Sequence, residues 1–240
     1  GTGKLWDGID ENYDVNHPWG GVGNVQKVVV DEGIIDLGNG RFRGEKNLSE
    51  IILPDSLERI GDFCFDYCRD SVSVDIPDNV KEIGNYAFHD LTFLSGVKIP
   101  SKIEIIGYHA FYGTMISEVT VPSSCKIIEG SAFSNCDYLE NISLACKEVG
   151  HSAFRDCDNI KSLKINEGVE KIDDWAFKEC KIDSIEISEG LRYIGKQAFA
   201  SCEFPYESNL IIPSSVETIE ERAFNVCGNL DKVSIAGKNI

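Results

Sequence analysis

The sequence has few basic residues and no long apolar run. Lys and Arg number 23 against 40 Asp and Glu, which gives a formal net charge of −17 over 240 residues. Such a charge repels nucleic-acid phosphates and anionic membrane surfaces. A membrane-spanning helix needs about 20 consecutive apolar residues, and the runs here are only a few residues long. We therefore expect neither a nucleic-acid partner nor direct membrane insertion.

Histidine is equally scarce, and no motif of a catalytic or cofactor site is present. The four histidines are far apart in the sequence, at positions 17, 89, 109 and 151. A nucleophilic pair such as Cys157 with His151 would need its thiol at the surface, whereas the repeat described below places that thiol inside. The glycine-rich segments at 20–23 and 38–40 lack the strand and helix context of a phosphate-binding loop. We expect no enzyme, no cofactor and no metal ion.

Phenylalanine marks an internal repeat of 21–25 residues. Nine of the twelve phenylalanines are separated by steps of that length, at positions 42, 65, 88, 111, 133, 154, 177, 199 and 224. An aliphatic residue always stands five positions before this Phe, and Ala stands directly before it in seven of the nine repeats. Cys stands three positions after it in six repeats, at positions 68, 136, 157, 180, 202 and 227. Regularity at this period is typical of repeat proteins.

Most repeats contain a short alternating segment, such as residues 74–77 or 97–100, which predicts a strand of three or four residues ended by proline. A second short strand is expected at residues 80–84 and their equivalents, and residues 84–88 predict a tight helical or 3₁₀ turn. One repeat cannot bury its own apolar residues, so the repeats must stack. The sequence therefore predicts a repeat solenoid with parallel strands about 4.8 Å apart, in which each slot becomes a column of like side chains.

The unit resembles the BspA-like leucine-rich repeat, which runs strand-Ile-Pro and then Val-x-x-Ile-Gly-x-x-Ala-Phe-x-x-Cys-x-x-Leu. Residues 76–94 and 212–230 match it nearly slot by slot. The resemblance covers residues 28–240, as about nine repeats and a final strand, and residues 1–27 resemble the N-terminal cap of such arrays. It implies a right-handed coil with parallel strands on one face and short second strands and turns on the other. It also implies export by bacteria, display at the cell surface and adhesion to host proteins.

The nine cysteines are predicted to be buried thiols. Six share the slot three positions after Phe, where stacked Cβ vectors point the same way instead of toward one another. Cys125 and Cys146 replace an aliphatic residue and Cys64 replaces Ala, all in inward slots. A free Cys in such a place behaves as a small apolar residue. One or more disulfides remain the alternative, and no CxxC pair is present to support a metal site.

Three surfaces are candidates for binding a partner. The outward strand column is mixed in charge and lacks the aromatic and Arg side chains of binding hot spots, so we interpret it as a solvated face. An aromatic patch is expected on the turn side of repeats two to four, with one Trp further along, and such a patch often marks a protein or glycan contact. Its alternative role is to cover the neighbouring turn.

The third candidate is an insert between repeats eight and nine, which predicts a bulging loop. Its alternative is a tolerated bulge with Phe204 tucked down. The candidate binding residues of the patch and the insert are Phe63, Tyr67, Tyr86, His89, Tyr108, His109, Tyr112, Trp175, Phe204 and Tyr206.

We therefore expect a non-catalytic binding or adhesion module of an exported or surface-displayed bacterial protein, which recognises a protein or glycan. The alternative is a structural spacer, or an accessory array attached to another domain such as an enzyme. The final strand at residues 232–235 has no evident polar cap. Because an open strand edge pairs readily, the chain is expected to continue or to form an edge-mediated dimer through this strand.

Overall fold

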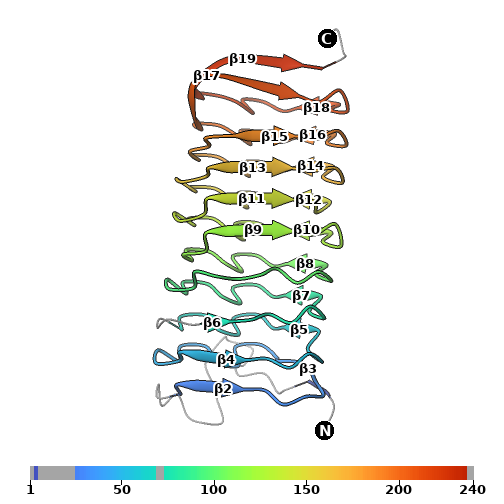
Figure 1. Cartoon of the computed structure of the whole chain (residues 1–240). Helices are drawn as coiled ribbons and strands as arrows, with labels where there is room; N and C mark the ends of the chain where they lie inside the picture. The colour runs from blue at the N-terminus through green and yellow to red at the C-terminus, as the bar shows by residue number, and fades with distance from the viewer. Residues whose placement is uncertain (1–2, 5–24, 69–72, 237–240) are drawn as a thin grey trace.

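The computed structural model describes residues 3–4, 25–68 and 73–236, which wind into one stack of coils (Figure 1). The chain climbs from one end of the stack to the other, so successive repeats lie side by side. Every strand pair among the described residues is parallel, and none of these residues is in a helix. The predicted repeat solenoid is confirmed.

One side of the stack carries the longer strands, in three parallel sheets. Their order along the axis is β2-β4-β6, then β9-β11-β13-β15, then β17-β19. Alternate residues face the core: Val119, Ile142 and Leu163 are aligned across β9, β11 and β13 and are all buried. The strands are β2 (Lys27–Val29), β4 (Glu50–Ile52), β6 (Ser73–Val74), β9 (Glu118–Val121), β11 (Asn141–Leu144), β13 (Ser162–Ile165), β15 (Ile185–Ile187), β17 (Glu203–Ile212) and β19 (Gly228–Ile235).

The strand predicted at residues 97–100 is wrong. Residues 95–100 are not in a strand, although Val97 and Ile99 are buried as the alternation requires. The preceding strand β6 is only two residues long, so there is little strand for this segment to pair with. Alternation fixes which side chains face inward, whereas a ladder also needs a neighbour in register.

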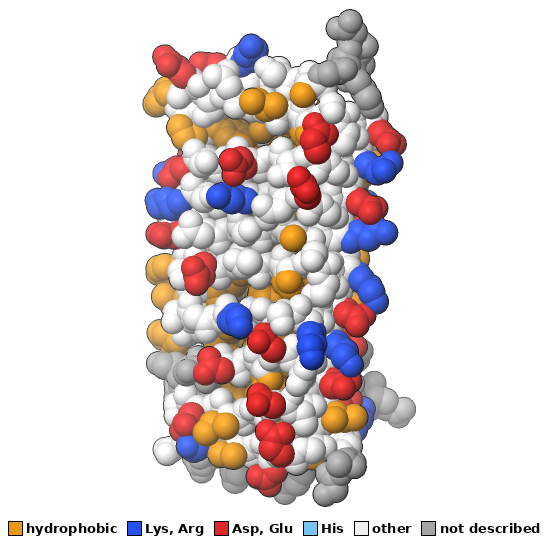
Figure 2. Space-filling model, turned by 45° about the vertical axis from the view of Figure 1, so that its right-hand side comes forward, with side chains coloured by type: hydrophobic (Ala, Val, Ile, Leu, Met, Phe, Trp, Pro, Cys, Tyr) orange, Lys and Arg blue, Asp and Glu red, His pale blue; other side chains and the backbone are white. Residues whose placement is uncertain are grey.

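The second short strands of the nine repeats, together with β1, form one continuous sheet of ten strands beside the first side (Figure 1). They are β1 (Gly3–Lys4), β3 (Ile34–Asp36), β5 (Arg59–Ile60), β7 (Glu82–Ile83), β8 (Ile105–Ile106), β10 (Ile127–Ile128), β12 (Glu148–Val149), β14 (Lys171–Ile172), β16 (Tyr193–Ile194) and β18 (Thr218–Ile219). Acidic and basic side chains are interspersed on this side of the stack (Figure 2). Glu58 and Lys81, on neighbouring coils, pair at 2.9 Å. Such pairs are exposed, so each stabilises the stack only slightly.

The tight turn on the remaining side is a run of hydrogen-bonded turns. It is not the regular helical or 3₁₀ turn that we expected, although some of its hydrogen bonds span three residues as in a 3₁₀ turn. We number the coils by their column phenylalanines, so that the third coil contains Phe88. In this coil, the N–H groups of Tyr86, Phe88 and Asp90 donate to carbonyl oxygens of the next coil. Those of Ala87 and His89 donate to oxygens three residues back in their own coil. Tyr86 and Asp90 both have a φ of +55°. With these left-handed residues in the turn, alternate N–H groups point along the stack and donate to the next coil. In a helix, the N–H groups would donate to carbonyl oxygens of the same segment.

The core confirms the predicted columns. All nine repeat phenylalanines stack in one row, with neighbouring ring centroids 5.1–5.4 Å apart and ring planes within 15° of parallel. The seven rings from Phe65 to Phe199 are fully buried, as are the Ala and aliphatic columns around them. Each coil therefore covers the apolar side of its neighbour, as a solenoid requires.

The cysteines are free thiols, and eight of the nine are buried. Each of the six thiols in the column after Phe donates a hydrogen bond of 3.0–3.3 Å to the carbonyl oxygen of the column Phe one coil earlier. Burial raises the pKa of Cys68 to about 12. The prediction of buried thiols without disulfides is confirmed.

The insert between repeats eight and nine is not the loop that we predicted. Its residues belong to β17, which pairs with β19 through an irregular register between Glu203 and Ser208. A β-bulge absorbs extra residues inside a strand pair without breaking it. Phe204 is tucked into the core at 5% exposure, whereas Tyr206 is 87% exposed.

Candidate binding surface

The structure brings seven of the predicted site residues together on the turn side of coils two to four. They form one network of touching rings, which we call the aromatic surface: Phe63, Tyr67, Tyr86, His89, Tyr108, His109 and Tyr112. Neighbouring ring centroids lie 4.1–6.0 Å apart. Tyr67 and Tyr108 are the most exposed of the rings, at 36% and 42%, and the others are half-buried.

The backbone beneath the surface is in an unusual conformation. Phe63, Tyr86 and His109 occupy the slot two positions before the column Phe, and each has a φ of 55–56°. A left-handed conformation costs a non-glycine residue roughly 1–2 kcal/mol. Coils five and six place serine in the same slot, at Ser131 and Ser152, with φ 55°. The backbone geometry therefore belongs to the coil and does not require a ring.

A buried carboxylate anchors one end of the aromatic surface. The side chain of Asp66 is only 2% exposed, and its two oxygens lie 2.9 Å from His89 Nδ1 and from Arg43 Nε. The Arg43 guanidinium in turn lies over the Phe63 ring, 5.2 Å from its centroid. Our sequence interpretation missed Asp66 and Arg43. Both stand one position after the column Phe, in the slot that also holds His89 and Tyr112, and this shared slot is the signal that identifies them.

The surroundings of two rings of the surface, His109 and Tyr86, favour their neutral forms. Burial lowers the pKa of the His109 imidazole, the charge of His89 lowers it further, and Asp90 opposes both. Burial, followed by the neighbouring Tyr108, raises the pKa of the Tyr86 hydroxyl. Near pH 7 the His109 and Tyr86 rings are therefore uncharged π faces.

The remaining candidates lie apart from this surface. Trp175 is on coil seven, where it contacts His151 at a centroid distance of 4.9 Å and Lys178 lies 5.6 Å from its ring centroid. Phe204 and Tyr206 lie in β17. Because Phe204 is buried, only Tyr206 of that pair is available to a partner.

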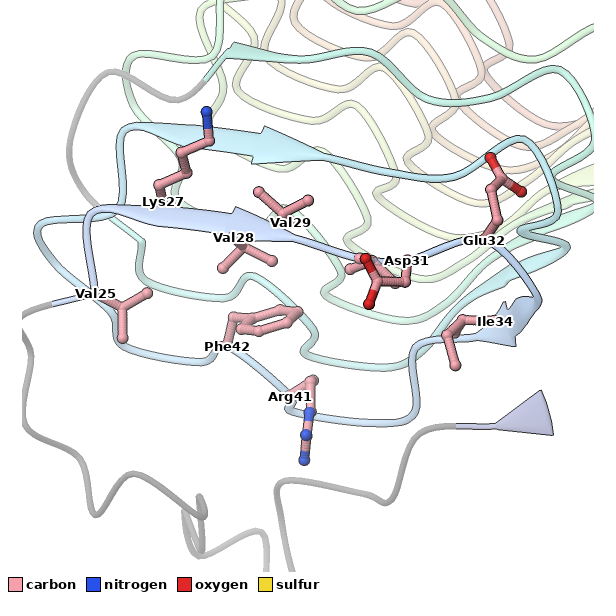
Figure 3. Close-up of a pocket in the computed structure, with 10 residues that line it drawn as sticks. Val25, Lys27, Val28, Val29, Asp31, Glu32, Ile34, Arg41 and Phe42 are labelled. Atoms are coloured by element: carbon pink, nitrogen blue, oxygen red, sulfur yellow. The ribbon is translucent and has the colours of Figure 1, made fainter. Parts of the chain in front are cut away.

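Two other surfaces are less suited to recognition. A shallow depression of about 370 Å³ on the outward strand face is lined by β9, β11 and β13, with Thr120, Ser143 and Lys164 among its residues. It has no aromatic or Arg side chain, which agrees with a solvated face. A cavity of about 450 Å³ at the N-terminal end lies between Val28, Phe42, Arg41 and the charged residues after β2 (Figure 3).

Val25 and Lys27, which also line this cavity, belong to the segment that we predicted to be a cap, residues 1–27. Most of that segment lies outside the described residues. Within the described part of the chain, no cluster of three His, Cys, Asp or Glu side chains has a geometry suited to a metal ion. Nor does any helix there meet the length and apolarity that crossing a membrane requires.

Parallel strands, columns of like residues and an outward aromatic surface together define a repeat scaffold of the leucine-rich class. The sequence model described as the BspA type leucine rich repeat region matches this chain in six copies, over residues 20–140 and 138–240. The chain belongs to this family.

Solved structures agree with that assignment. A leucine-rich repeat protein from Bacteroides ovatus is 28% identical, with a TM-score of 0.76 over 89% of this chain. The chain spans 58% of the length of that protein. Leucine-rich repeat proteins from Eubacterium ventriosum (21% identity, TM-score 0.57, covering 98% of this chain and 78% of that one) and T. pallidum (23%, 0.56, covering 82% and 86%) share the fold. No curated protein matches the chain.

Proposed function

We propose that this chain is a non-catalytic binding module of an exported or surface-displayed bacterial protein, and that it holds a protein or glycan partner on the aromatic surface. The observation that carries this proposal is the concentration of seven touching rings on three adjacent coils. Exposed aromatic patches of this kind are typical of interaction sites. Display at the cell surface is what the family resemblance implies for such arrays.

The rings are not needed to build a coil, which favours a role in binding over structural cover. Coil five has Gly130, Ser131 and Ser134 in the slots that hold Tyr108, His109 and Tyr112 in coil four. Its column Phe and Cys are nevertheless fully buried. A coil therefore buries its core with small side chains on this side, which favours a role of the rings of coils two to four beyond closing their own coils.

A rigid scaffold suits such a role. The rings contact one another and rest on a backbone tied to both neighbouring coils by hydrogen bonds. Side chains that are already ordered lose little conformational entropy when a partner binds. The alternative is a spacer that holds another domain away from the surface, and the mixed, solvated strand face is the feature that favours it.

A binding screen with matched variants tests the proposal. Immobilised host matrix proteins and a glycan array are probed with the unmodified chain, with the double variant Tyr108→Asn and Tyr112→Ser, and with Tyr138→Ala. The two replacements copy Asn85 and Ser134, which fill the same slots in neighbouring coils. Tyr138 is an exposed aromatic outside the surface, at 54%.

We expect the double variant to lose retention by at least one partner while Tyr138→Ala keeps it. If the double variant retained every partner, the proposal that partners bind on the aromatic surface would be contradicted. A chain that binds nothing in the screen would favour the spacer.

A further inference from the structure

Building on the proposed function, we infer that the aromatic surface takes a cationic side chain, so that the partner is a protein segment carrying exposed Arg or Lys. The inference rests on how this chain places its own cations, on the rings and carboxylates of coils three and four, and on the charge of the whole chain.

The first observation is a cation already seated at the end of the surface. Arg43 lies over the Phe63 ring at 5.2 Å and pairs through Nε with Asp66 at 2.9 Å. One guanidinium thus contacts a ring face and a carboxylate at the same time. Arginine suits this role because its planar group stacks on aromatic rings while its N–H groups bind a carboxylate.

The same arrangement recurs twice elsewhere. Lys178 Nζ lies 5.6 Å from the Trp175 ring centroid and 3.3 Å from Glu179 Oε1. Lys171 Nζ lies 5.8 Å from the Tyr193 ring centroid and 3.2 Å from Asp173. At three places in the stack, a ring beside a carboxylate is therefore matched by a cation.

On coils three and four, the rings and the carboxylate have no such Lys or Arg among the described residues. Asp90 lies beside His89, with its side chain 37% exposed, and contacts no Lys or Arg of the described residues. Among those residues, none of the cations lies over Tyr86, Tyr108 or Tyr112. Arg155 follows in the column of Tyr112 two coils later, but Glu179 and Asp156 pair with it at 2.7 and 3.2 Å.

The charge of the whole chain favours the same partner. With a net charge of −17, the protein attracts basic segments over long distances and repels acidic ones. The neutral π faces then supply short-range recognition that charge alone does not. An anionic glycan would meet carboxylates here, so the ring and carboxylate combination fits a cation better.

The test uses short peptides of defined composition at about 0.15 M salt, where long-range attraction is screened. A peptide alternating Gly and Arg is titrated into the unmodified chain, and its citrulline counterpart supplies the same shape without charge. The chain variants are the double variant Tyr108→Asn and Tyr112→Ser, which leaves the net charge unchanged, and Tyr138→Ala as its control. Asp90→Asn is compared with Glu186→Gln, which removes the same charge from the strand face.

We expect the Arg peptide to bind and the citrulline peptide not to bind. The double variant should weaken binding of the Arg peptide about tenfold, with Tyr138→Ala unchanged, and Asp90→Asn should weaken it more than Glu186→Gln. Equal affinity for the double variant and its control, or equal effects of the two charge removals, would mean attraction by net charge alone and would overturn the inference.

Failure of the inference is distinguishable from failure of the proposed function. If the Arg peptide does not bind while the double variant still loses a partner in the screen, the surface binds but its ligand is not a cation. If both the peptide and the screen give nothing, both proposals fail.

Discussion

A thiol in the column after Phe serves as a hydrogen-bond donor and a small apolar filler. Its S–H group reaches the carbonyl oxygen of the column Phe one coil earlier, at 3.0 Å in the case of Cys180 and Phe154. Burial raises the pKa of five of these thiols, which therefore stay protonated at neutral pH: Cys68, Cys136, Cys180, Cys202 and Cys227. Because the thiolate is the reactive form of cysteine, we expect these thiols to react slowly with alkylating and oxidising reagents.

Thiol titration of the native protein at pH 8 should therefore show one fast cysteine. Cys227 is the only half-buried thiol of the nine, and we expect it to react first, with the other eight following slowly. All nine should react in denaturant. The variant Cys227→Ser should lose the fast phase, and rapid labelling of most thiols in the folded chain would contradict the buried column.

At the scale of single residues, much of the candidate site could be predicted from spacing. Tyr86 and His109 share a slot in adjacent repeats, so their contact follows directly from stacking. The pairs that Asp66 forms with Arg43 and His89 were not anticipated. They link side chains of different types on three successive coils, with Asp66 on the middle coil. The spacing also left open whether Phe204 is tucked down: Phe204 and Tyr206 are two residues apart, yet only the first is buried.

At the scale of elements, the phenylalanine column packs each coil against its neighbours. Phe133 and Phe154 lie mid-stack, fully buried, with ring neighbours 5.1–5.2 Å away on both sides. Truncating such a ring removes apolar burial and leaves a cavity that rigid neighbouring coils cannot fill.

Phe133→Ala or Phe154→Ala should each lower the free energy of unfolding by about 3–5 kcal/mol, as measured by chemical denaturation. Phe93→Ala is the matched control, since this ring lies outside the column and is 54% exposed, and its effect should be small. A thermal shift below about 1 °C for both column variants would contradict this role of the column.

The type and order of the elements could be read from the sequence, but not all of their pairing. The period, the second strands and the inward alternation all follow from residue spacing. The missing strand at residues 95–100 depends on the length of its neighbour β6, and the bulge in β17 depends on its register with β19. Both are properties of strand pairs, which one strand's own residues do not specify.

At the scale of the whole molecule, the C-terminal end of the described stack is apolar and open. Val233 stands in register with the buried Leu210 in the inward column, yet it is 44% exposed because no described coil covers it. Ile235 is likewise 38% exposed. An uncovered strand with apolar side chains is prone to pair with another edge.

The edge-mediated dimer therefore stays a prediction with a direct test. Light scattering coupled to size exclusion should show a mass that rises toward a dimer with concentration, and Val233→Lys should abolish the rise. Ile211→Lys places the same charge on the outward face of β17, where Ile211 is 63% exposed, and should leave the dimer intact. A protein that stayed monomeric at every concentration would contradict the edge-mediated dimer.

The alternation of N–H groups in the turns has a mechanical consequence. Half of these groups donate along the stack, as Phe88 does to Ala110, so a pull on the two ends loads the junctions between coils in series. In a series of springs the weakest junction yields first, and an end coil has a neighbour on one side only. Under tension the protein would lose coils from its ends while the middle of the stack stayed wound.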